Sequence, residues 1–573
     1  MTATLPLRQA AEAEASGAHN GSATQQSPNC VPILEQPVFK KRKLRVVCVG
    51  AGYAGLMMAY KWKYQMKVDD FVDLVIYEKN NDVGGTWLVN RYPGVACDIP
   101  AHIYTFSFEP NPNWSSFFAS GPEIWEYMKK TTEKYHLDER VQFNSRVTST
   151  IWDDADGKWK LEINQNGNTI QDEADVLING SGILHKWSWP DFGGLDTFRG
   201  KKIHSAAWDA SVDWTGKRVA IIGNGSSAIQ ILPQMQPKAA KIVNYIRTPT
   251  WISANYASQL IPDGKNFNYT EEEKKEFREN PKKLLELQSL IEHHINKSFL
   301  ALLVDTPEQL RAEAAFKKEM EKRLNNDAEL CAKLIPEWKV GCRRLTPGEG
   351  YLEALQEPNV AIEFAAIEAA TETGIKTMNG TEEFDIIVCA TGFDVSFAPF
   401  WDLVGKNGIR LADQWRDDPE AYFGICAPNM PNYFIFNGPN CPVGHGSVLA
   451  AMDATADYIL RWCSKIATED IKGSVRSVTV NDGATADYNI YSQEFLKRTV
   501  WTSGCRSWYK SKKDGKVTAM YAGSSIHYKQ ILQSFRTEDF DFEYNSRNRF
   551  RFMGNGLTIR EDNGEHLGFP VDK

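Results

Sequence analysis

A glycine-rich turn near the start of the chain has the residue types and spacing that hold a dinucleotide. A short apolar strand, 44–49, leads into Gly50, Gly52 and Gly55, and a helix-compatible stretch follows. Glycines at this spacing allow a tight turn, close approach of a pyrophosphate and close packing of the helix on the strand. Glu78 ends the next strand, where an acceptor for ribose hydroxyl groups is expected. The turn therefore predicts a dinucleotide site, and the alternative is an ordinary turn of an α/β sheet.

A second turn repeats this arrangement but is followed by a basic residue. Its strand, 218–222, runs into Gly223, Asn224, Gly225, Ser226, Ser227 and Ala228. Alanine is tolerated at the third glycine position of the pattern. The next strand ends at Arg247 and Thr248, where an acidic residue would favour NAD. An arginine can pair with a 2′-phosphate, which predicts NADPH over NADH. The alternative is that Arg247 forms a surface salt bridge.

A third stretch could cover a flat ring and present a carboxylate. It runs from Gly84 to Asp98 and contains Thr86 and Trp87. The indole of Trp87 could lie over a ring-shaped ligand. Asp98 lies in mostly apolar sequence and needs a cationic partner if it is buried. The alternative is a core loop whose aspartate caps a helix.

The elements around these turns predict an α/β protein with two Rossmann-like dinucleotide-binding domains. By analogy with other chains that carry two such units, the first is expected to bind FAD. From Glu271 to Leu334 the chain is charged, lacks strand patterns and repeats leucine and isoleucine at helical spacing. We interpret this segment as a helical insertion in the second unit. A buried strand is expected over 384–389 and a long helix over about 447–466.

Composition and charge exclude several other classes of protein. The chain has 573 residues, of which 42% are apolar and 24% charged, as is typical of globular rather than disordered or fibrous proteins. Its formal charge of −8 and the lack of a basic cluster make it a poor nucleic-acid binder. No apolar run reaches ~18 residues, so no membrane-spanning helix is expected.

The cysteines and the N-terminus bear on the cellular compartment. The ten cysteines form no Cys-x-x-Cys pair and no metal-ligand spacing, so we interpret them as reduced thiols of a cytoplasmic protein without a metal site. The first residues lack the apolar core of a signal peptide, and they carry acidic residues that disfavour a mitochondrial presequence. Residues 1–42 are expected to form a disordered extension.

Two long motifs resemble signatures of the type I Baeyer–Villiger monooxygenases. The stretch 198–209, FRGKKIHSAAWD, resembles the family fingerprint F-x-G-x-x-x-H-x-x-x-W-(P/D). The stretch 84–98 resembles the second signature, G-G-x-W-x-x-x-x-Y-P-G-x-x-x-D. Both glycine turns and the sequence Ala-Thr-Gly at 390–392 fall in the family's order. The resemblance covers the chain from about Lys43 to the C-terminus, and the N-terminal extension resembles that of fungal members.

The resemblance implies an FAD domain made of two separated stretches, with the NADP domain between them. His204 of the fingerprint is expected to link the domains, or to be a core histidine bonded to a backbone carbonyl, rather than an acid or base. The expected division of the chain is an extension over 1–42, FAD domain over 43–190, NADP domain over 191–380 with the insertion at about 256–340, and the second part of the FAD domain over 381–573.

The resemblance also assigns roles to further residues. The segment 341–347, GCRRLTP, resembles the family's Cys-(Lys/Arg)-Arg segment, which makes Arg344 the active-site arginine and Arg343 a second contact for the 2′-phosphate. The alternative is two solvated arginines. Asp98 would orient Arg344, and Trp508 would touch the nicotinamide ribose unless it is a plain core tryptophan. Further FAD contacts are expected from Thr86, Trp87, Ile99, Tyr104 and Val147.

The implied reaction inserts one oxygen next to a ketone carbonyl. In this family NADPH reduces FAD, dioxygen gives a flavin C4a-peroxide, and attack on the ketone leads through a tetrahedral intermediate to an ester or lactone. The partners are a small-molecule ketone of secondary metabolism and dioxygen, in a monomer or weak homo-oligomer. His445 could be a substrate contact or an ordinary loop residue.

Three other functions fit parts of the sequence. A flavin monooxygenase that oxidises nitrogen or sulfur atoms shares the two-dinucleotide plan, but it has less use for an Asp98–Arg344 pair. A disulfide reductase would need a redox cysteine pair near the flavin, and no two cysteines are close in sequence. A flavin-binding sensor or interaction module that stores NADPH is the third, and the intact set of Asp98, Arg247 and Arg344 disfavours it.

Overall fold

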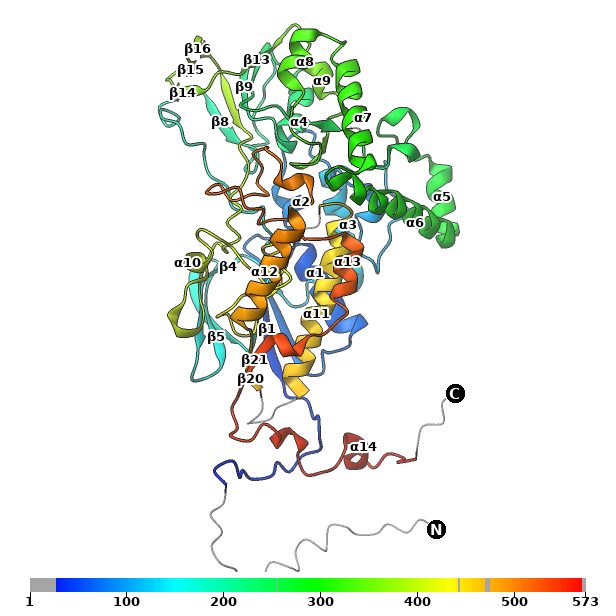
Figure 1. Ribbon diagram of the computed structural model, residues 1–573, viewed down its shortest axis with the longest axis vertical. Coiled ribbons are helices and arrows are strands. Elements are labelled where there is room, and N and C mark those ends of the chain that lie inside the picture. The colour runs from blue at the N-terminus through cyan, green and yellow to red at the C-terminus, as the bar shows by residue number, and fades with distance from the viewer. Residues whose placement is uncertain (1–26, 254, 442–443, 469–474, 569–573) are drawn as a thin grey trace, which may run out of the picture.

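The computed structural model describes residues 27–253, 255–441, 444–468 and 475–568, and Figure 1 shows their arrangement. In the view of Figure 1 the FAD-type domain forms the lower half, and the second dinucleotide unit forms the upper half. The helical insertion lies beside both.

The first parallel sheet carries the first glycine turn. It has the order β19-β7-β1-β2-β3, with bounds β1 Leu44–Val49, β2 Val72–Tyr77, β3 Val141–Gln142, β7 Val176–Asn179 and β19 Tyr433–Ile435. All neighbouring strands are parallel, and nearly every residue of β1, β2 and β7 is buried. Burial on both faces explains why these strands read as continuous apolar runs. Helix α1, Tyr53–Tyr60, follows the turn and continues as a π-helical turn, Lys61–Gln65.

A second sheet packs beside the first. Its order is β18-β4-β5-β6, with bounds β4 Ser145–Asp153, β5 Lys158–Gln165, β6 Asn168–Ala174 and β18 Asp402–Val404. Strands β4 and β5 alternate between buried and exposed residues, because one face packs on the core and the other meets solvent.

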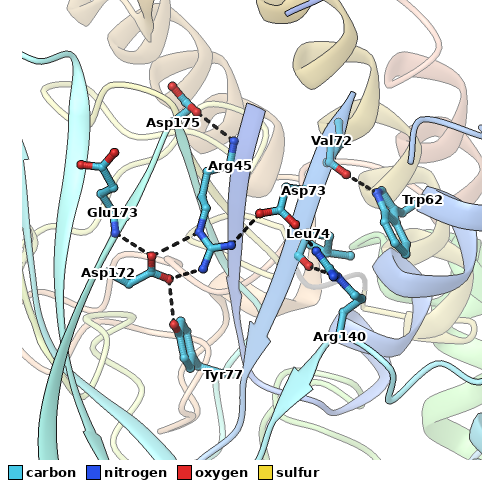
Figure 2. A network of polar contacts seen from close by, with 10 residues as sticks. All are labelled: Arg45, Trp62, Val72, Asp73, Leu74, Tyr77, Arg140, Asp172, Glu173 and Asp175. Carbon is cyan, nitrogen blue, oxygen red and sulfur yellow. Dashed lines mark hydrogen bonds and ion pairs between the residues drawn. The ribbon is translucent and has the colours of Figure 1, made fainter. Parts of the chain in front are cut away.

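Polar contacts tie the first sheet to the edge strand β6 of the second (Figure 2). The Arg45 guanidinium pairs with Asp73 at 2.6 Å and with Asp172 at 2.7 Å. The hydroxyl of Tyr77 donates to Asp172 at 2.7 Å, and the amide of Arg45 donates to Asp175 at 2.8 Å. Arg45 lies near the start of β1, and Tyr77 ends β2, where its carbonyl accepts from the amide of Gly50. The network therefore stabilises the strands that carry the glycine turn.

The second parallel sheet carries the second glycine turn. It has the order β13-β10-β9-β17-β8, with bounds β8 Lys201–His204, β9 Arg218–Ile222, β10 Lys241–Tyr245, β13 Val360–Glu363 and β17 Ile386–Cys389. Helix α4, Ser226–Met235, follows the turn. A small antiparallel sheet consists of β14 Ile367–Ala370, β15 Gly374–Thr377 and β16 Gly380–Glu383.

Strand β17 pairs with β8 and β9 and so lies in this second sheet, beyond the domain boundary expected at residue 380. We therefore propose that the second part of the FAD-type domain begins after Cys389. The strand also places the Ala-Thr-Gly sequence at 390–392 directly after the sheet, beside the second glycine turn.

The insertion leaves the second unit and returns to it at one point. Strand β11, Ile252–Ser253, pairs in parallel with β12, Thr346–Pro347. Between them lie α5 Glu271–Glu279, α6 Pro281–Lys297, α7 Pro307–Arg323 and α8 Ala328–Leu334. Thr270 forms a capping box with Glu273 at the start of α5, which explains why the charged stretch begins its helix there. The return strand β12 follows Arg343 and Arg344 directly.

The C-terminal part covers one face of the first sheet, where Figure 1 shows α11, α12 and α13 side by side. Their bounds, with the strands β20 and β21, are α11 Val448–Thr468, α12 Asp482–Leu496, α13 Ser525–Ile531, β20 Val475–Val480 and β21 Phe540–Tyr544. Helix α11 packs against α1 and α13. The fully buried Lys61 joins α11 through Asp457 at 2.8 Å and Asp453 at 3.1 Å.

The remaining helices are short or peripheral: α2 Thr86–Val89, α3 Gly121–Tyr135, α9 Tyr351–Ala354, α10 Leu411–Gln414 and α14 Ile559–Asp562.

Residues 1–26 of the expected extension lie outside the described residues. The amide of Val38 donates to the carbonyl of Leu557, and the amide of Asn555 to that of Gln36. Residues 27–42 therefore have defined contacts with the C-terminal segment. No helix in the described ranges is long and apolar enough to cross a membrane.

Candidate active site

The first glycine turn is shaped so that only glycine fits at its tightest points. A Cβ on Gly50 would lie 2.7 Å from the carbonyl oxygen of Gly180, and one on Gly55 would lie 2.2 Å from that of Gly50. Gly52 faces Gly85, where an added Cβ would lie 3.1 Å from the Gly52 Cα. Helix α1 has no side-chain cap, so its first N–H groups are free to bind phosphate. The turn fits a dinucleotide pyrophosphate.

Glu78 lies beside this turn and is held in place by it. The amide of Ala51 donates to Glu78 Oε2 at 2.8 Å. The amide and the side chain of Asn80 donate to Oε1 at 2.8 and 2.7 Å. Each carboxylate oxygen has two lone pairs, so the fixed carboxylate retains capacity to accept from ribose hydroxyl groups.

The other expected FAD contacts lie in three places. The ring of Trp87 meets the edge of Tyr104 at 5.7 Å between centroids, and Tyr104 meets Tyr53 of α1 at 5.5 Å. Ile99 is buried, and it lies close to these aromatic residues in the sequence. Thr86 is exposed and begins α2. Val147 lies on β4 instead, in the core between the two sheets.

The second glycine turn has the same features. Gly223 has a φ of +112°, and a Cβ there would lie 2.5 Å from the carbonyl oxygen of Ala390. A Cβ on Gly225 would meet no atom within 4 Å, and α4 begins without a side-chain cap. The turn thus leaves open space at the N–H groups of α4, which suits a phosphate.

Hydrogen bonds connect the second turn to its surroundings. The side chain of Asn224 donates to the carbonyl of Thr248 at 2.8 Å. The hydroxyl of Ser226 lies 2.8 Å from that of Thr346 on β12. Ser227 is half-buried and Ala228 is buried. The return strand of the insertion is therefore fixed to the start of α4.

Two arginines meet near this turn without an acidic partner. Arg247 is exposed and Arg343 is half-buried, and neither forms an ion pair with any residue in the described ranges. Burial lowers the pKa of Arg343, and the charge of Arg247 lowers it further. Arg247 precedes Thr248, whose carbonyl accepts from Asn224, and Arg343 lies three residues before Thr346, which contacts Ser226, so both arginines lie close to the turn. Such a pair favours an anion, and the surface salt bridge considered for Arg247 is not present among the described residues.

Arg344, unlike this pair, binds a carboxylate, that of Asp98. Its Nε donates to Asp98 Oδ2 at 2.9 Å and its Nη2 to Oδ1 at 2.6 Å. The Asp98 carboxylate raises the pKa of Arg344 above its ordinary value. The side chains of Arg344 and Asp98 are 37% and 17% exposed, so the pair lies at an accessible surface. A guanidinium has five N–H donors, and donors remain for a second anionic group.

The loop that carries Asp98 is docked on α4. The hydroxyl of Tyr92 donates to Gln230 Oε1 at 2.9 Å, and Gln230 Nε2 donates to the carbonyl of Ala96 at 3.1 Å. Asp98 comes from the FAD-type domain and Arg344 from the second unit. The ion pair therefore lies at the junction of the two dinucleotide domains.

His204 ends β8 and joins the fingerprint to the Ala-Thr-Gly sequence. The amide of Ala206 donates to its Nδ1 at 3.1 Å, so the ring proton lies on Nε2, 3.3 Å from the Thr391 hydroxyl. The ring stacks on Trp187 at 4.3 Å. Burial lowers the pKa of His204 to about 4, which keeps the ring neutral. Its partners are thus an amide and a hydroxyl rather than the expected backbone carbonyl.

Trp508 and His445 were the other two residues considered as ligand contacts. Trp508 is half-buried and meets the ring of Tyr509 at 4.7 Å, so it is not a fully enclosed core residue. His445 is buried against Phe299, and its Nε2 lies 3.4 Å from the hydroxyl of Ser525. Burial lowers the pKa of His445 to about 4. The loop residues 442–443 beside it lie outside the described ranges.

The interpretation of all ten cysteines as reduced thiols is wrong for two of them. Cys342 and Cys505 form a disulfide, and their Cα atoms are 6.1 Å apart. The other eight cysteines are free. The pairing was not recognisable beforehand, because the two residues are separated by 163 positions and are brought together only by folding. Among the described residues, no group of three metal-ligating side chains occurs.

Sequence reasoning also missed residues that surround the arginines. Tyr256 and Tyr509 are both close enough to Arg344 for its charge to lower their pKa values against the upward effect of burial. Tyr256 belongs to no motif, and its hydroxyl donates to the carbonyl of Leu345 at 3.1 Å. Tyr509 directly follows Trp508, and that adjacency was the one available signal.

Comparisons with known proteins agree with this arrangement. The flavin-binding monooxygenase-like family model matches residues 42–300. The chain is 51% identical to the FAD-binding monooxygenase tazF of Aspergillus terreus, over 93% of this chain and 95% of that protein. It is 35% identical to a Baeyer–Villiger monooxygenase of Pseudomonas aeruginosa, over 86% and 90% of the two chains. The chain belongs to the flavin-binding monooxygenase family. Within it, the chain resembles the type I Baeyer–Villiger monooxygenases.

The fold is that of this family as well. A cyclohexanone monooxygenase of Rhodococcus sp. Phi1, solved with NADP+ bound, matches with a TM-score of 0.75 at 23% identity and covers 88% of this chain and all of its own. The α/β architecture with two dinucleotide-binding domains is therefore confirmed. This protein is a flavin-dependent monooxygenase.

Proposed function

We propose that this flavin monooxygenase uses NADPH and dioxygen to insert one oxygen atom next to a ketone carbonyl, giving an ester or lactone. The observation that carries the proposal is the Asp98–Arg344 ion pair at the junction of the two dinucleotide domains. In this proposal the pair presents an oriented guanidinium where both cofactors would meet. The two relatives named above, an FAD-binding and a Baeyer–Villiger monooxygenase, support the same reaction class.

The first turn fits FAD and the second fits NADPH. Gly50, Gly52 and Gly55 would hold the FAD pyrophosphate, and Glu78 its ribose. Arg247 and Arg343 would bind the 2′-phosphate of NADPH, because they form an unpaired cationic group beside the second turn. When bound, NADPH supplies the hydride and FAD the site at which dioxygen is activated.

Arg344 stabilises negative charge in this proposal. As the oxygen nucleophile adds to a ketone, charge develops on the carbonyl oxygen of the substrate. A guanidinium can donate hydrogen bonds to that oxyanion without transferring a proton to it, because arginine stays protonated. Asp98 holds Arg344 by two charge-assisted hydrogen bonds, so the guanidinium is oriented before the reaction.

A heteroatom oxygenase is the second candidate. It shares the family and the two cofactor turns. An amine or sulfide substrate develops no oxyanion on its own atoms, so a fixed arginine would contribute less to that reaction. The pair at 2.6 and 2.9 Å therefore favours the ketone reaction.

The test is a product analysis with matched substrates. The purified protein, loaded with FAD, receives NADPH, dioxygen and either a ketone panel or an amine and a sulfide. We expect NADPH oxidation that is coupled to ester formation with at least one ketone. N-oxide or sulfoxide formation without any ester would establish the second candidate instead.

A further inference from the structure

The Cys342–Cys505 disulfide joins two segments that both contact the proposed active site. Cys342 directly precedes Arg343 and Arg344, and Cys505 belongs to the loop that leads to Trp508 and Tyr509. The Cα separation of 6.1 Å lies within the range of ordinary disulfides. Both cysteines are buried. The crosslink therefore connects the NADP-type unit with the C-terminal part of the chain at the arginine pair.

The arginine segment is fixed at both of its ends. On one side, β12 begins at Thr346 and pairs with β11, and Thr346 also contacts Ser226 at the second glycine turn. On the other side, the disulfide holds Cys342 to Cys505. Arg343 and Arg344 lie between these two points and have no secondary structure of their own.

A lysine lies beside the crosslink. Lys510 Nζ is 3.6 Å from the sulfur of Cys342 and 3.9 Å from that of Cys505. It also donates to the carbonyls of Ser503 and Cys505. Burial lowers the pKa of Lys510. Whenever it is protonated, its charge stabilises a thiolate at either sulfur, which assists the opening of the disulfide.

We propose that the Cys342–Cys505 disulfide is a positioning crosslink for Arg343 and Arg344, and that its reduction by a dithiol loosens the NADPH site. The proposal rests on the function proposed above for the two arginines. Without the crosslink the segment keeps β12 and the Asp98–Arg344 ion pair but loses its anchor at Cys342. The 2′-phosphate contact of Arg343, the residue next to Cys342, is therefore weakened most, and the orientation of Arg344 less.

The redox step balances with two named reagents. A thiolate of the dithiol attacks the Cys505 sulfur and expels the Cys342 thiolate beside Lys510. The second thiol of the reagent then releases Cys505, so the reagent becomes a disulfide and the protein gains two thiols. Hydrogen peroxide reverses the change: it takes two electrons and two protons from the thiols and yields two water molecules.

Thiol counting tests the crosslink independently of any activity. The protein is denatured and alkylated with iodoacetamide, with and without prior dithiothreitol, and its intact mass is measured. Because eight of the ten cysteines are free, eight adducts are expected before reduction and ten after it. Ten adducts without reduction would overturn the proposal, whatever the enzyme turns out to catalyse.

Affinity for NADP+ tests the positioning role. The FAD-loaded protein is titrated with NADP+ by calorimetry in three forms: oxidised, reduced with dithiothreitol, and reoxidised with hydrogen peroxide. We expect the Kd to rise about fivefold on reduction and to return on reoxidation. FAD content measures general damage and should stay within error. The melting temperature should fall on reduction and return on reoxidation, because an open disulfide no longer constrains the unfolded chain. An unchanged Kd would refute the proposal.

Variants separate the crosslink from other thiols. Cys505→Ser should raise the Kd for NADP+ as reduction does, and dithiothreitol should then have no further effect. Cys30→Ser, at an exposed free cysteine, is the matched control and should behave as the wild type.

If Cys505→Ser fails to fold, reduction of the wild-type protein still decides the question. A dithiothreitol effect that persists in Cys505→Ser would assign it to another cysteine. If NADP+ binds in all forms but no ketone is oxidised, the proposed ketone reaction is refuted. The thiol count and the Kd values then still decide the crosslink proposal.

Discussion

At the scale of single residues, the chemistry depends on how three arginines are partnered. Arg344 has a carboxylate on two of its nitrogen atoms, whereas Arg247 and Arg343 have no acidic partner among the described residues. The first arrangement suits a cation that must keep one orientation, and the second suits capture of a phosphate. The sequence contained each arginine, but the partner of Arg344 lies 246 positions away in the chain.

Replacement of Arg344 tests its role directly. Arg344→Ala should still allow NADPH to bleach the flavin under anaerobic conditions, but ester formation should fall by about 10² to 10³, the usual effect of losing one oxyanion donor. Arg344→Lys keeps the charge but loses the two-point contact to Asp98. Its rate of ester formation should lie between those of the wild type and Arg344→Ala. The rate of flavin reduction and the ester yield are measured separately. Full ester yield in Arg344→Ala would remove this residue from the mechanism.

Replacement of Arg247 tests cofactor choice. Arg247→Ala removes a charge-assisted contact, of about 1.5–3 kcal/mol, from the 2′-phosphate that only NADPH carries. The KM for NADPH should therefore rise about tenfold or more, while that for NADH hardly changes. Arg199→Ala, at an exposed arginine paired with Glu372, is the control and should alter neither. Equal increases for both nucleotides would contradict the phosphate contact.

At the scale of elements, the sequence pattern predicted the strands well, but it did not predict the contacts between distant segments. Strands β1 and β9 have the bounds expected from the sequence. These strands are recognisable because burial on both faces makes them apolar throughout. The β11–β12 pairing and the disulfide were not predictable, since each joins residues about a hundred or more positions apart and neither leaves a local signal.

The buried ion pairs between Lys61 and α11 predict different stability losses for replacing the aspartates and for replacing the lysine. Lys61 is fully buried and is paired with Asp453 and Asp457. Replacing both aspartates by asparagine leaves a buried charge without a counterion, and should destabilise the protein by about 3 kcal/mol. Lys61→Met removes the charge itself and should be nearly neutral. Melting temperatures of both variants decide this, and a larger loss for Lys61→Met would contradict the account.

At the scale of the whole molecule, the site exists only where the two dinucleotide domains meet. Asp98 is supplied by one domain and Arg344 by the other, and the loop of Asp98 rests on α4 through Gln230. The sequence motifs could name these residues, because each motif is local. Their pairing was expected only from the family resemblance, and the structure shows it. The motifs alone do not give it, since it depends on how the domains dock.

Buried histidines predict how the whole molecule responds to acid. Burial lowers the pKa values of His102, His204 and His445 from 6.5 to about 4. The unfolded chain then binds more protons than the folded one between pH 6.5 and 4, so stability is full above pH 6.5 and falls as the pH drops towards 4. Melting temperatures measured across this range should decrease. His102 has no hydrogen-bond partner on its ring among the described residues, so His102→Leu should reduce the slope. An unchanged slope would contradict its neutral buried state.

Oxygen labelling tests the proposed reaction most directly. The enzyme is supplied with NADPH, a ketone that it accepts and ¹⁸O₂, and the product is analysed by mass spectrometry. We predict an ester or lactone with one ¹⁸O in the newly formed C–O–C linkage and none in the carbonyl group, in wild-type protein but not in Arg344→Ala. Label found only in an oxidised nitrogen or sulfur atom, or in no organic product, would contradict the account.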